Sequence, residues 1–179
     1  MIIKSKKIKI KILLLMLSLG VLMASCGGKE RKKVEEEKSS VYEEQDQTVE
    51  SSSGITHILL QSNDDMRFDK NEITVKEGQL VKITLKHMGK MPKTAMGHNF
   101  VLLKKGVSLS DFANKAAQAV GPEYELPAEI SASTIIYTKM IGGGESVTVE
   151  FQAPAKGTYD YLCSFPGHYA MMKGLFIVQ

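Results

Sequence analysis

The sequence predicts an all-β protein, a Greek-key β-sandwich or barrel with one helical insertion around residues 109–120. Three observations predict it. Short runs rich in Val, Ile, Thr, Phe and Tyr recur along the last two thirds of the chain. Gly, Pro, Asn and Asp separate these runs, as they do in turns. Residues 55–179 also provide enough chain to form one hydrophobic core.

Six segments of this region have the composition of β-strands. Several of them alternate apolar and polar residues, which indicates strands with one buried face. The six segments are 73–75, 80–85, 99–103, 146–151, 159–163 and 175–178. Many short strands at such intervals favour an antiparallel sandwich or barrel.

Residues 110–120 differ from the rest of the domain. The segment is rich in Ala, begins with Ser110 and Asp111, and is followed by Gly121 and Pro122. Ser and Asp cap helix N-termini, and Gly followed by Pro ends a helix. The sequence therefore predicts a helix that is inserted between strands and is not a layer of the core.

Residues 1–25 have the features of a secretory signal peptide. Five Lys precede an apolar run from Ile12 to Met23, which is too short for a membrane-spanning helix. The segment 22–26, LMASC, resembles a bacterial lipobox, although Met23 stands where Leu is usual. The resemblance implies cleavage before Cys26 and lipid on this residue. We therefore expect a membrane-anchored protein of the bacterial cell envelope, facing the periplasm or the cell surface. An ordinary signal peptide is the alternative.

Removal of this signal reverses the sign of the net charge. The 179-residue chain has 23 Lys and Arg against 20 Asp and Glu, a formal net charge of +3. The signal contains five Lys and no acidic residue, so the mature chain has a net charge of −2. No basic surplus remains that would support nucleic-acid binding.

Residues 26–54 are predicted to connect the lipidated Cys26 to the folded domain, residues 55–179. This segment is rich in Lys, Glu, Ser and Gln, and its apolar residues are isolated. Such a segment cannot bury enough surface to offset its ordering entropy, so we expect a flexible tether that reaches about 30 Å. A short surface helix in the charged run is the alternative.

The residues with metal-binding chemistry lie mostly in the last quarter of the chain. The segment 163–172, CSFPGHYAMM, places Cys163, His168 and Met residues in one tight loop after a strand, and His98 lies far upstream. Two His and one Cys with a long axial Met are the ligand set of a blue-copper centre. A Cys and a His close together can instead act as a nucleophile and its base.

Five segments of the domain resemble the azurins, blue-copper proteins of the cupredoxin family. The segments are 63–68, 71–75, His87 with 91–99, 137–145 and 163–174. They occur in order across nearly the whole domain. The resemblance implies a one-electron carrier with one copper ion as cofactor, and not an enzyme. It implies c-type cytochromes or copper redox enzymes as partners, and we expect a monomer.

Carried over by position, the resemblance also implies the metal ligands. From strongest to weakest, they are His98, Cys163 and His168, then the axial Met172, then the backbone carbonyl of Gly97. Met172 is preferred to its neighbour Met171 because Lys-Gly follows it. Asn99 is expected to connect the two ligand-bearing loops and to tune the thiolate.

The chain also departs from the azurin pattern. Azurins have a disulfide whose two positions are Thr56 and Gly78 here, so this cross-link is absent. Its loss is expected to cost on the order of 2–4 kcal/mol of stability unless packing compensates. Phe100 and Tyr137 stand where azurins often have Trp and a surface His. We expect His87 to be a partly buried, hydrogen-bonded residue without metal.

The resemblance further implies an apolar docking patch beside the metal site. The residues of this docking patch are Met66, Met91, Met96, Phe165, Pro166 and Gly167. A patch without charge suits weak, transient contacts with several partners. The alternative is that these Met side chains fill gaps in the core.

Two other functions could use the same residues. An envelope copper chaperone or copper-storage module would use the same ligands to pass on or hold the ion. A Cys–His hydrolase or redox-active enzyme is disfavoured, because the sequence has no recognisable oxyanion element and the ligand set leaves no open metal position.

Overall fold

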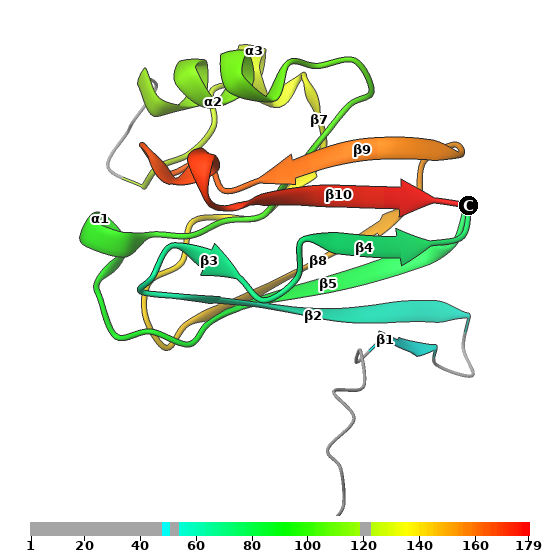
Figure 1. The fold of residues 1–179 in the computed structure, drawn as a ribbon, viewed down its shortest axis with the longest axis horizontal. Coiled ribbons are helices and arrows are strands. Elements are labelled where there is room, and N and C mark those ends of the chain that lie inside the picture. The colour runs from blue at the N-terminus through cyan, green and yellow to red at the C-terminus, as the bar shows by residue number, and fades with distance from the viewer. Residues whose placement is uncertain (1–47, 51–53, 119–122) are drawn as a thin grey trace, which may run out of the picture. The chain divides into compact units, whose positions relative to one another are not determined.

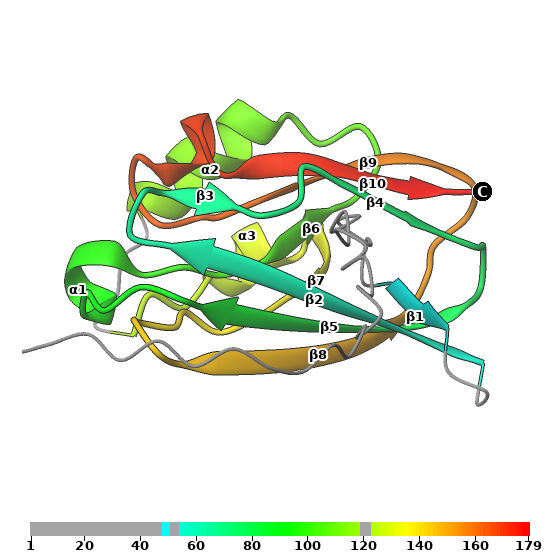
Figure 2. The ribbon, with the colours of Figure 1, turned by 60° about the horizontal axis from the view of Figure 1, so that its bottom comes forward.

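The strands of this protein form two facing β-sheets. The structure is a computed structural model that describes residues 48–50, 54–118 and 123–179. The predicted signal, Cys26 and most of the tether lie outside these residues. Figures 1 and 2 show the sheets as two layers, with short helices beside them. This arrangement confirms the all-β sandwich with a small helical insertion.

The first sheet has the strand order β1-β2-β5-β8, and β3 also pairs with β2. Its strands are β1 (Thr48–Glu50), β2 (Ile55–Asn63), β3 (Arg67–Phe68), β5 (Leu80–His87) and β8 (Ser146–Gln152). β1 pairs with residues 56–58 of β2. The sheet therefore begins before residue 55, inside the segment that the sequence assigned to the tether.

The second sheet has the strand order β4-β10-β9-β6-β7. Its strands are β4 (Glu72–Val75), β6 (Val101–Leu103), β7 (Thr134–Tyr137), β9 (Gly157–Leu162) and β10 (Lys173–Val178). The sandwich departs from the expected antiparallel pairing at two places, because β2 pairs with β5, and β4 with β10, in parallel. Between β2 and β5 the chain crosses to the other sheet to form β4, and this crossing lets β5 return parallel to β2.

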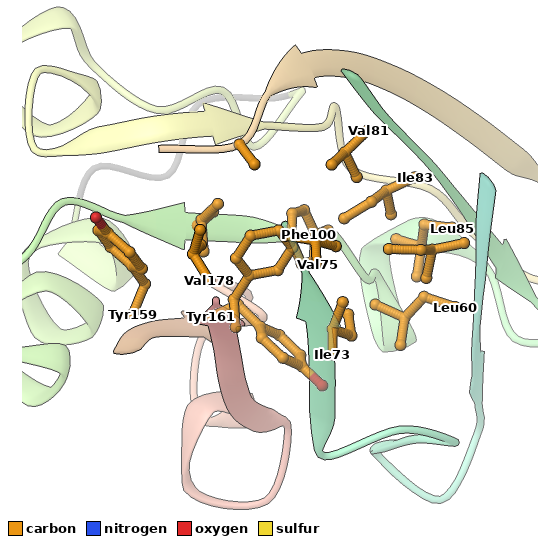
Figure 3. Packing of buried hydrophobic residues seen from close by; sticks show 14 of the residues in the cluster. Leu60, Ile73, Val75, Val81, Ile83, Leu85, Phe100, Tyr159, Tyr161 and Val178 are labelled. Carbon is orange, nitrogen blue, oxygen red and sulfur yellow. The ribbon is translucent and has the colours of Figure 1, made fainter. Parts of the chain in front are cut away.

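The core lies between the two sheets, and β5 shows how the sequence builds it. Along this strand Val81, Ile83 and Leu85 are buried, whereas the residues between them are more exposed. They form one cluster with Phe100, which directly precedes β6, and with Tyr161 of β9 in the facing sheet (Figure 3). Full burial of a side chain of this size contributes about 1.5–3 kcal/mol.

The predicted helix is confirmed as α2 (Leu109–Gln118). The cap differs from the expectation, because Ser108 and not Ser110 accepts the backbone N–H of Asp111 through its Oγ (3.3 Å). The buried face of α2, which includes Phe112, packs on β6 and β9 in a second, smaller cluster. A shorter helix, α3 (Ala128–Ser131), follows. In the described ranges no helix has the length and apolar character needed to cross a membrane.

The loops at one end of the sandwich bring distant parts of the sequence together. α1 (Lys93–Met96) follows β5, and the 3₁₀ helix η1 (His168–Ala170) follows β9. Figure 1 shows α1 and the turn after β9 at the same end of the molecule. The candidate metal ligands lie in and beside these two segments.

Candidate metal centre

Three buried side chains place their donor atoms together at this end. Cys163 Sγ lies 3.9 Å from His98 Nδ1 and 3.8 Å from His168 Nδ1. All three donor atoms lie within 4.8 Å of one another. Donors that surround an ion in one plane at metal–ligand distances of about 2.0–2.3 Å are separated by about 3.5–4 Å. The two measured separations therefore fit a trigonal His–Cys–His metal site.

His98 is held by hydrogen bonds on both its backbone and its ring. Its N–H donates to the carbonyl of Ile141, and the N–H of Ile141 donates back, both at 2.9 Å. Its Nε2 lies 2.9 Å from the carbonyl oxygen of Asn63, which can only accept, so Nε2 carries the proton. The lone pair of Nδ1 is therefore available and faces Cys163.

Cys163 and His168 are positioned by the turn that follows β9. The backbone N–H of Cys163 donates to the carbonyl of Met172 (3.0 Å), which joins the two ends of the loop. Gly167 has a φ of +82°, which allows the sharp turn before η1. The N–H of His168 then donates to the carbonyl of Phe165 (3.0 Å). The loop thereby directs the imidazole back toward the thiol.

Burial controls the protonation of these groups. It lowers the pKa of His98 and of His168 to about 4, and it raises the pKa of the Cys163 thiol to about 11. Without metal, the three groups are therefore neutral near pH 7. A bound cation compensates the cost of a buried thiolate, which makes the donor set suited to a metal ion. A fully buried thiol with a raised pKa is the opposite of an activated nucleophile, so these observations disfavour the Cys–His hydrolase.

His87 lies against the site without providing a donor to it. Its ring stacks on that of His98, with centroids 4.3 Å apart and planes inclined by 27°. Its Nε2 lies 2.9 Å from the carbonyl of Met96, and its Nδ1 accepts the N–H of Gly89 (3.0 Å). His87 is fully buried and hydrogen-bonded on both nitrogens, so it is more buried than the sequence predicted.

Asn99 connects the two ligand-bearing loops, as the sequence predicted. Its Nδ2 donates to Ser164 Oγ (2.9 Å), and its Oδ1 accepts the backbone N–H of Ser164 (2.8 Å). Asn99 follows His98 and Ser164 follows Cys163, so this pair of bonds fixes the distance between two candidate ligands. The tuning of the thiolate by Asn99 stays a prediction.

The two candidate axial groups belong to chain segments that are bonded to the ligand residues. The carbonyl oxygen of Gly97 is 3.8 Å from Cys163 Sγ. Met172 is completely buried, whereas 52% of the surface of Met171 is exposed. The N–H of Met172 also donates to the carbonyl of His168 (2.8 Å). Burial therefore favours Met172 over Met171 as the thioether that faces the site.

The sequence did not assign a role to the turn formed by Asn63 and Asp64. Asn63 fixes the His98 ring, and the Asp64 carboxylate accepts the backbone N–H groups of Lys90 (2.8 Å) and Met91 (3.3 Å). The bond from Lys90 is the main reason that the pKa of Asp64 is lowered. These residues read as turn formers in the sequence, because nothing local indicates which distant groups they will meet.

The predicted docking-patch residues differ in exposure. Pro166 and Gly167 are exposed, as are Met66 (36%) and Met91 (39%), whereas the remaining two, Met96 and Phe165, are half-buried. Met66 and Met91 are both attached to the Asn63–Asp64 turn, because the N–H of Met66 donates to the Asn63 carbonyl and that of Met91 donates to the Asp64 carboxylate. The exposed Met residues therefore do not fill gaps in the core. Met88 and Met171 are also exposed, although neither is among the predicted patch residues.

At the other end of β2, one position of the missing azurin disulfide contains a buried hydroxyl without a hydrogen-bond partner in the described residues. Thr56 is buried, and its Oγ1 is the buried side-chain oxygen for which the described residues offer no hydrogen-bond partner. Gly78 has a φ of +69°. Within the described part of the chain, Cys163 is the free cysteine.

A two-sheet β-sandwich with a buried His–Cys–His triangle at one end defines a blue-copper protein of the cupredoxin class. The family model of copper-binding proteins of the plastocyanin/azurin family matches residues 55–179. The chain belongs to this family, and its cofactor is one copper ion. The donor set fits that ion, because a soft thiolate and two imidazoles suit both oxidation states of copper.

Three relatives show the extent of the similarity. Azurin-1 of Alcaligenes xylosoxydans xylosoxydans is 45% identical over 63% of this chain and 89% of its own. Auracyanin-A of Chloroflexus aurantiacus is 30% identical over 96% of this chain and 98% of its own. The solved structure of auracyanin A, described as a "blue" copper protein, has a TM-score of 0.63 and covers 70% of this chain and 100% of that one. Outer membrane protein H.8 of Neisseria gonorrhoeae is 38% identical over 64% of this chain and 63% of its own.

Proposed function

We propose that this protein is a membrane-tethered carrier of single electrons in the bacterial cell envelope. The observation that carries this proposal is the buried triangle of His98, Cys163 and His168. The hydrogen bonds that hold these residues use their backbone groups and the Nε2 atom of His98, so the three donor atoms stay available for a metal ion. Because hydrogen bonds within the protein hold the ligand residues, the donors would keep their positions when the charge of a bound ion changes. A site that rearranges little is suited to electron transfer.

Each residue of the site has a distinct part in this function. A copper ion held by these residues would supply one-electron chemistry through its Cu(II) and Cu(I) states. The Cys163 thiolate would provide the soft donor, the two imidazoles would provide donors that suit both states, and Met172 and the Gly97 carbonyl would complete the donor set. The near-complete burial of the three donor residues excludes water from the site.

Partners are proposed to approach through the docking patch. His168 retains 4% exposure, whereas His98 and Cys163 have none, so His168 is the ligand nearest the surface. Its ring lies 4.5 Å from that of the patch residue Phe165. The proposed partners are c-type cytochromes or copper redox enzymes that bind transiently to this apolar surface, with the protein acting as a monomer.

The proposed location follows from the N-terminal region. Cys26 is the proposed lipid-attachment site, and residues 26–54 would allow the domain to reach partners from the membrane surface. A relative named outer membrane protein H.8 supports an envelope location. The site residues and the anchor would then act in separate parts of the chain.

The optical spectrum tests this proposal. Copper-loaded protein is expected to show an intense visible thiolate-to-Cu(II) band that bleaches on reduction. Cys163→Ser should abolish the band, whereas the matched variant Cys26→Ser should keep the band and release the protein from the membrane fraction. A colourless copper adduct of the wild-type protein would contradict the proposal.

The copper chaperone or copper-storage alternative makes a different kinetic prediction. An electron carrier should exchange electrons between its own oxidised and reduced molecules much faster than it loses copper to a chelator. Rapid copper loss with slow electron self-exchange would favour the chaperone, because transfer of the ion requires the ligands to open. The two rates can be measured on the same copper-loaded sample.

A further inference from the structure

Residues 123–126, which we call the strap, contact both loops that carry the metal ligands. On one side, the hydroxyl of Tyr124 donates a hydrogen bond to the carbonyl of Thr94 in α1 (3.3 Å). Glu123 forms an ion pair with Lys93 of the same helix. Because α1 leads directly into the loop of the first His ligand, the strap is attached to that loop.

On its other side the strap packs on the loop between Cys163 and His168. The ring centroid of Tyr124 lies 5.2 Å from that of Phe165, with the planes inclined by 31°. Phe165 in turn lies 4.5 Å from His168, with an inclination of 36°. A void of only about 10 Å³ lies where the strap meets this loop. Tyr124 is therefore separated from a metal ligand by a single aromatic ring.

The Phe165 ring is enclosed on three sides. His168 and Tyr124 provide two of them. Gly97 provides the third, since a Cβ at this position would lie 3.0 Å from Phe165 Cδ2. The space left by Gly97 thus lets the ring pack closely against the chain beside His98. Removal of Tyr124 would open the one side that is formed by a residue outside the two ligand loops.

The backbone of Tyr124 indicates that its position is imposed by these contacts. Its φ is +57°, a left-handed conformation that is unfavourable for a side chain with a Cβ. Strain of this kind persists where the surrounding structure holds the residue in place. The ring contact with Phe165 and the hydrogen bond to Thr94 are the contacts that do so. The exposed Glu123–Lys93 pair contributes little, because solvent screens it.

We propose that Tyr124 is a positioning residue that holds Phe165 against His168 and so keeps the imidazole at the distance from Cys163 that copper requires. The inference rests on the proposed function only in that copper occupies the site. Beyond that function, it assigns an effect on copper retention to Tyr124, which acts on His168 through Phe165. Loosening the Tyr124–Phe165 contact would let the His168 ring move and release the ion faster.

Two substitutions at Tyr124 and one matched control test this role. Tyr124→Asn removes the ring and keeps a residue type that tolerates positive φ. It should accelerate copper loss to a chelator by about 2- to 10-fold, the effect expected for one aromatic pair. Tyr124→Phe keeps the ring and should release copper at nearly the wild-type rate. Tyr137→Asn makes the same change at a half-exposed Tyr in β7 and should have no effect on release.

A second readout uses the metal-free protein and does not depend on electron transfer. NMR signals of the His168 and Phe165 rings should broaden or shift in Tyr124→Asn and stay unchanged in Tyr124→Phe and Tyr137→Asn. A lower thermal midpoint in Tyr124→Asn with unchanged ring signals and unchanged release would overturn the proposal, since it would indicate a merely structural role. If the wild-type protein lacked the visible band, the proposed function would fail, while the ring signals would still decide the role of Tyr124.

Discussion

The core between the sheets and the metal-bearing end of the sandwich are both buried, but they are stabilised in different ways. The core consists of apolar side chains such as Ile83 and Phe100, which contribute by excluding water. The metal end contains buried polar side chains, His87, His98 and Asn99, each with a specific hydrogen-bond partner. In the core, stability depends mostly on the size and shape of the side chains, whereas at the metal end it depends on each hydrogen-bond donor and acceptor individually.

This difference predicts that the two regions respond differently to substitution. A core substitution should change stability and leave the copper spectrum unchanged, because it leaves the ligand positions intact. A substitution at the metal end should change stability and spectrum together, because the same hydrogen bonds support the fold and hold the ligands.

The largest effect on stability is expected from a cavity in the core. Ile83→Ala should lower the free energy of unfolding by about 2–5 kcal/mol, and Ile83→Val by about 0.5–1.5 kcal/mol. Urea denaturation of the copper-loaded protein measures both values. The visible band should keep its position in both variants. A shifted band in Ile83→Ala would show that core and metal end are not independent.

The bond pair between the ligand loops should give a smaller loss of stability together with a spectral change. Asn99→Ala leaves the buried N–H and Oγ of Ser164 without this partner, which is expected to cost about 1–3 kcal/mol. Copper should also be lost faster and the band should shift. Asn71→Ala, at an exposed position before β4, is the control and should change neither property. A stable Asn99→Ala protein with an unaltered band would remove the proposed link between the loops.

Acid should destabilise the metal end of the metal-free protein selectively. The pKa of His98 and of His168 is about 4 in the folded state, against about 6.5 in an unfolded chain, so the unfolded state binds more protons between these values. The contribution of these two neutral His residues to the free energy of unfolding is present above pH 6.5 and is lost as the pH falls toward 4, on the order of 1–2 kcal/mol for each His between pH 7 and 5. Thermal midpoints of the metal-free protein from pH 8 to 4 measure this loss. His168→Gln should flatten the curve, and a flat wild-type curve would contradict the assignment.

The smallest effect is expected at the end of the sandwich away from the metal. Thr56→Val removes the buried hydroxyl that has no partner and should raise stability by about 1 kcal/mol. Thr138→Val is the opposite control, because Thr138 Oγ1 accepts the backbone N–H of Phe100 (3.0 Å) and its removal should destabilise. Denaturation midpoints compare the two variants. Equal and negative effects would show that the Thr56 hydroxyl has a partner in solution.

Local sequence patterns predicted much of this molecule. Alternating residues indicated β5, and the Ala-rich segment between Ser and Gly-Pro indicated α2. β1, β2, β3 and β7 were not among the six segments assigned as strands, although β2 is the longest strand of the described residues. The parallel pairing of β2 with β5 was also missed, because composition indicates that a segment is a strand and does not indicate which strand it will meet.

By itself, the sequence determined the donor set, because thiol and imidazole chemistry depends on residue type, and the pattern around Cys163 and His168 resembles the azurins. Only the tertiary structure decided how these donors are held. The contacts of Asn63 with His98, of Asp64 with the loop after β5, and of Tyr124 with Phe165 join residues that are 26 to 41 positions apart. Such contacts form when the sandwich brings its loops to one end, so no local sequence pattern predicts them. Residue chemistry therefore decided which metal is bound, and the fold decided how firmly the ligands are held.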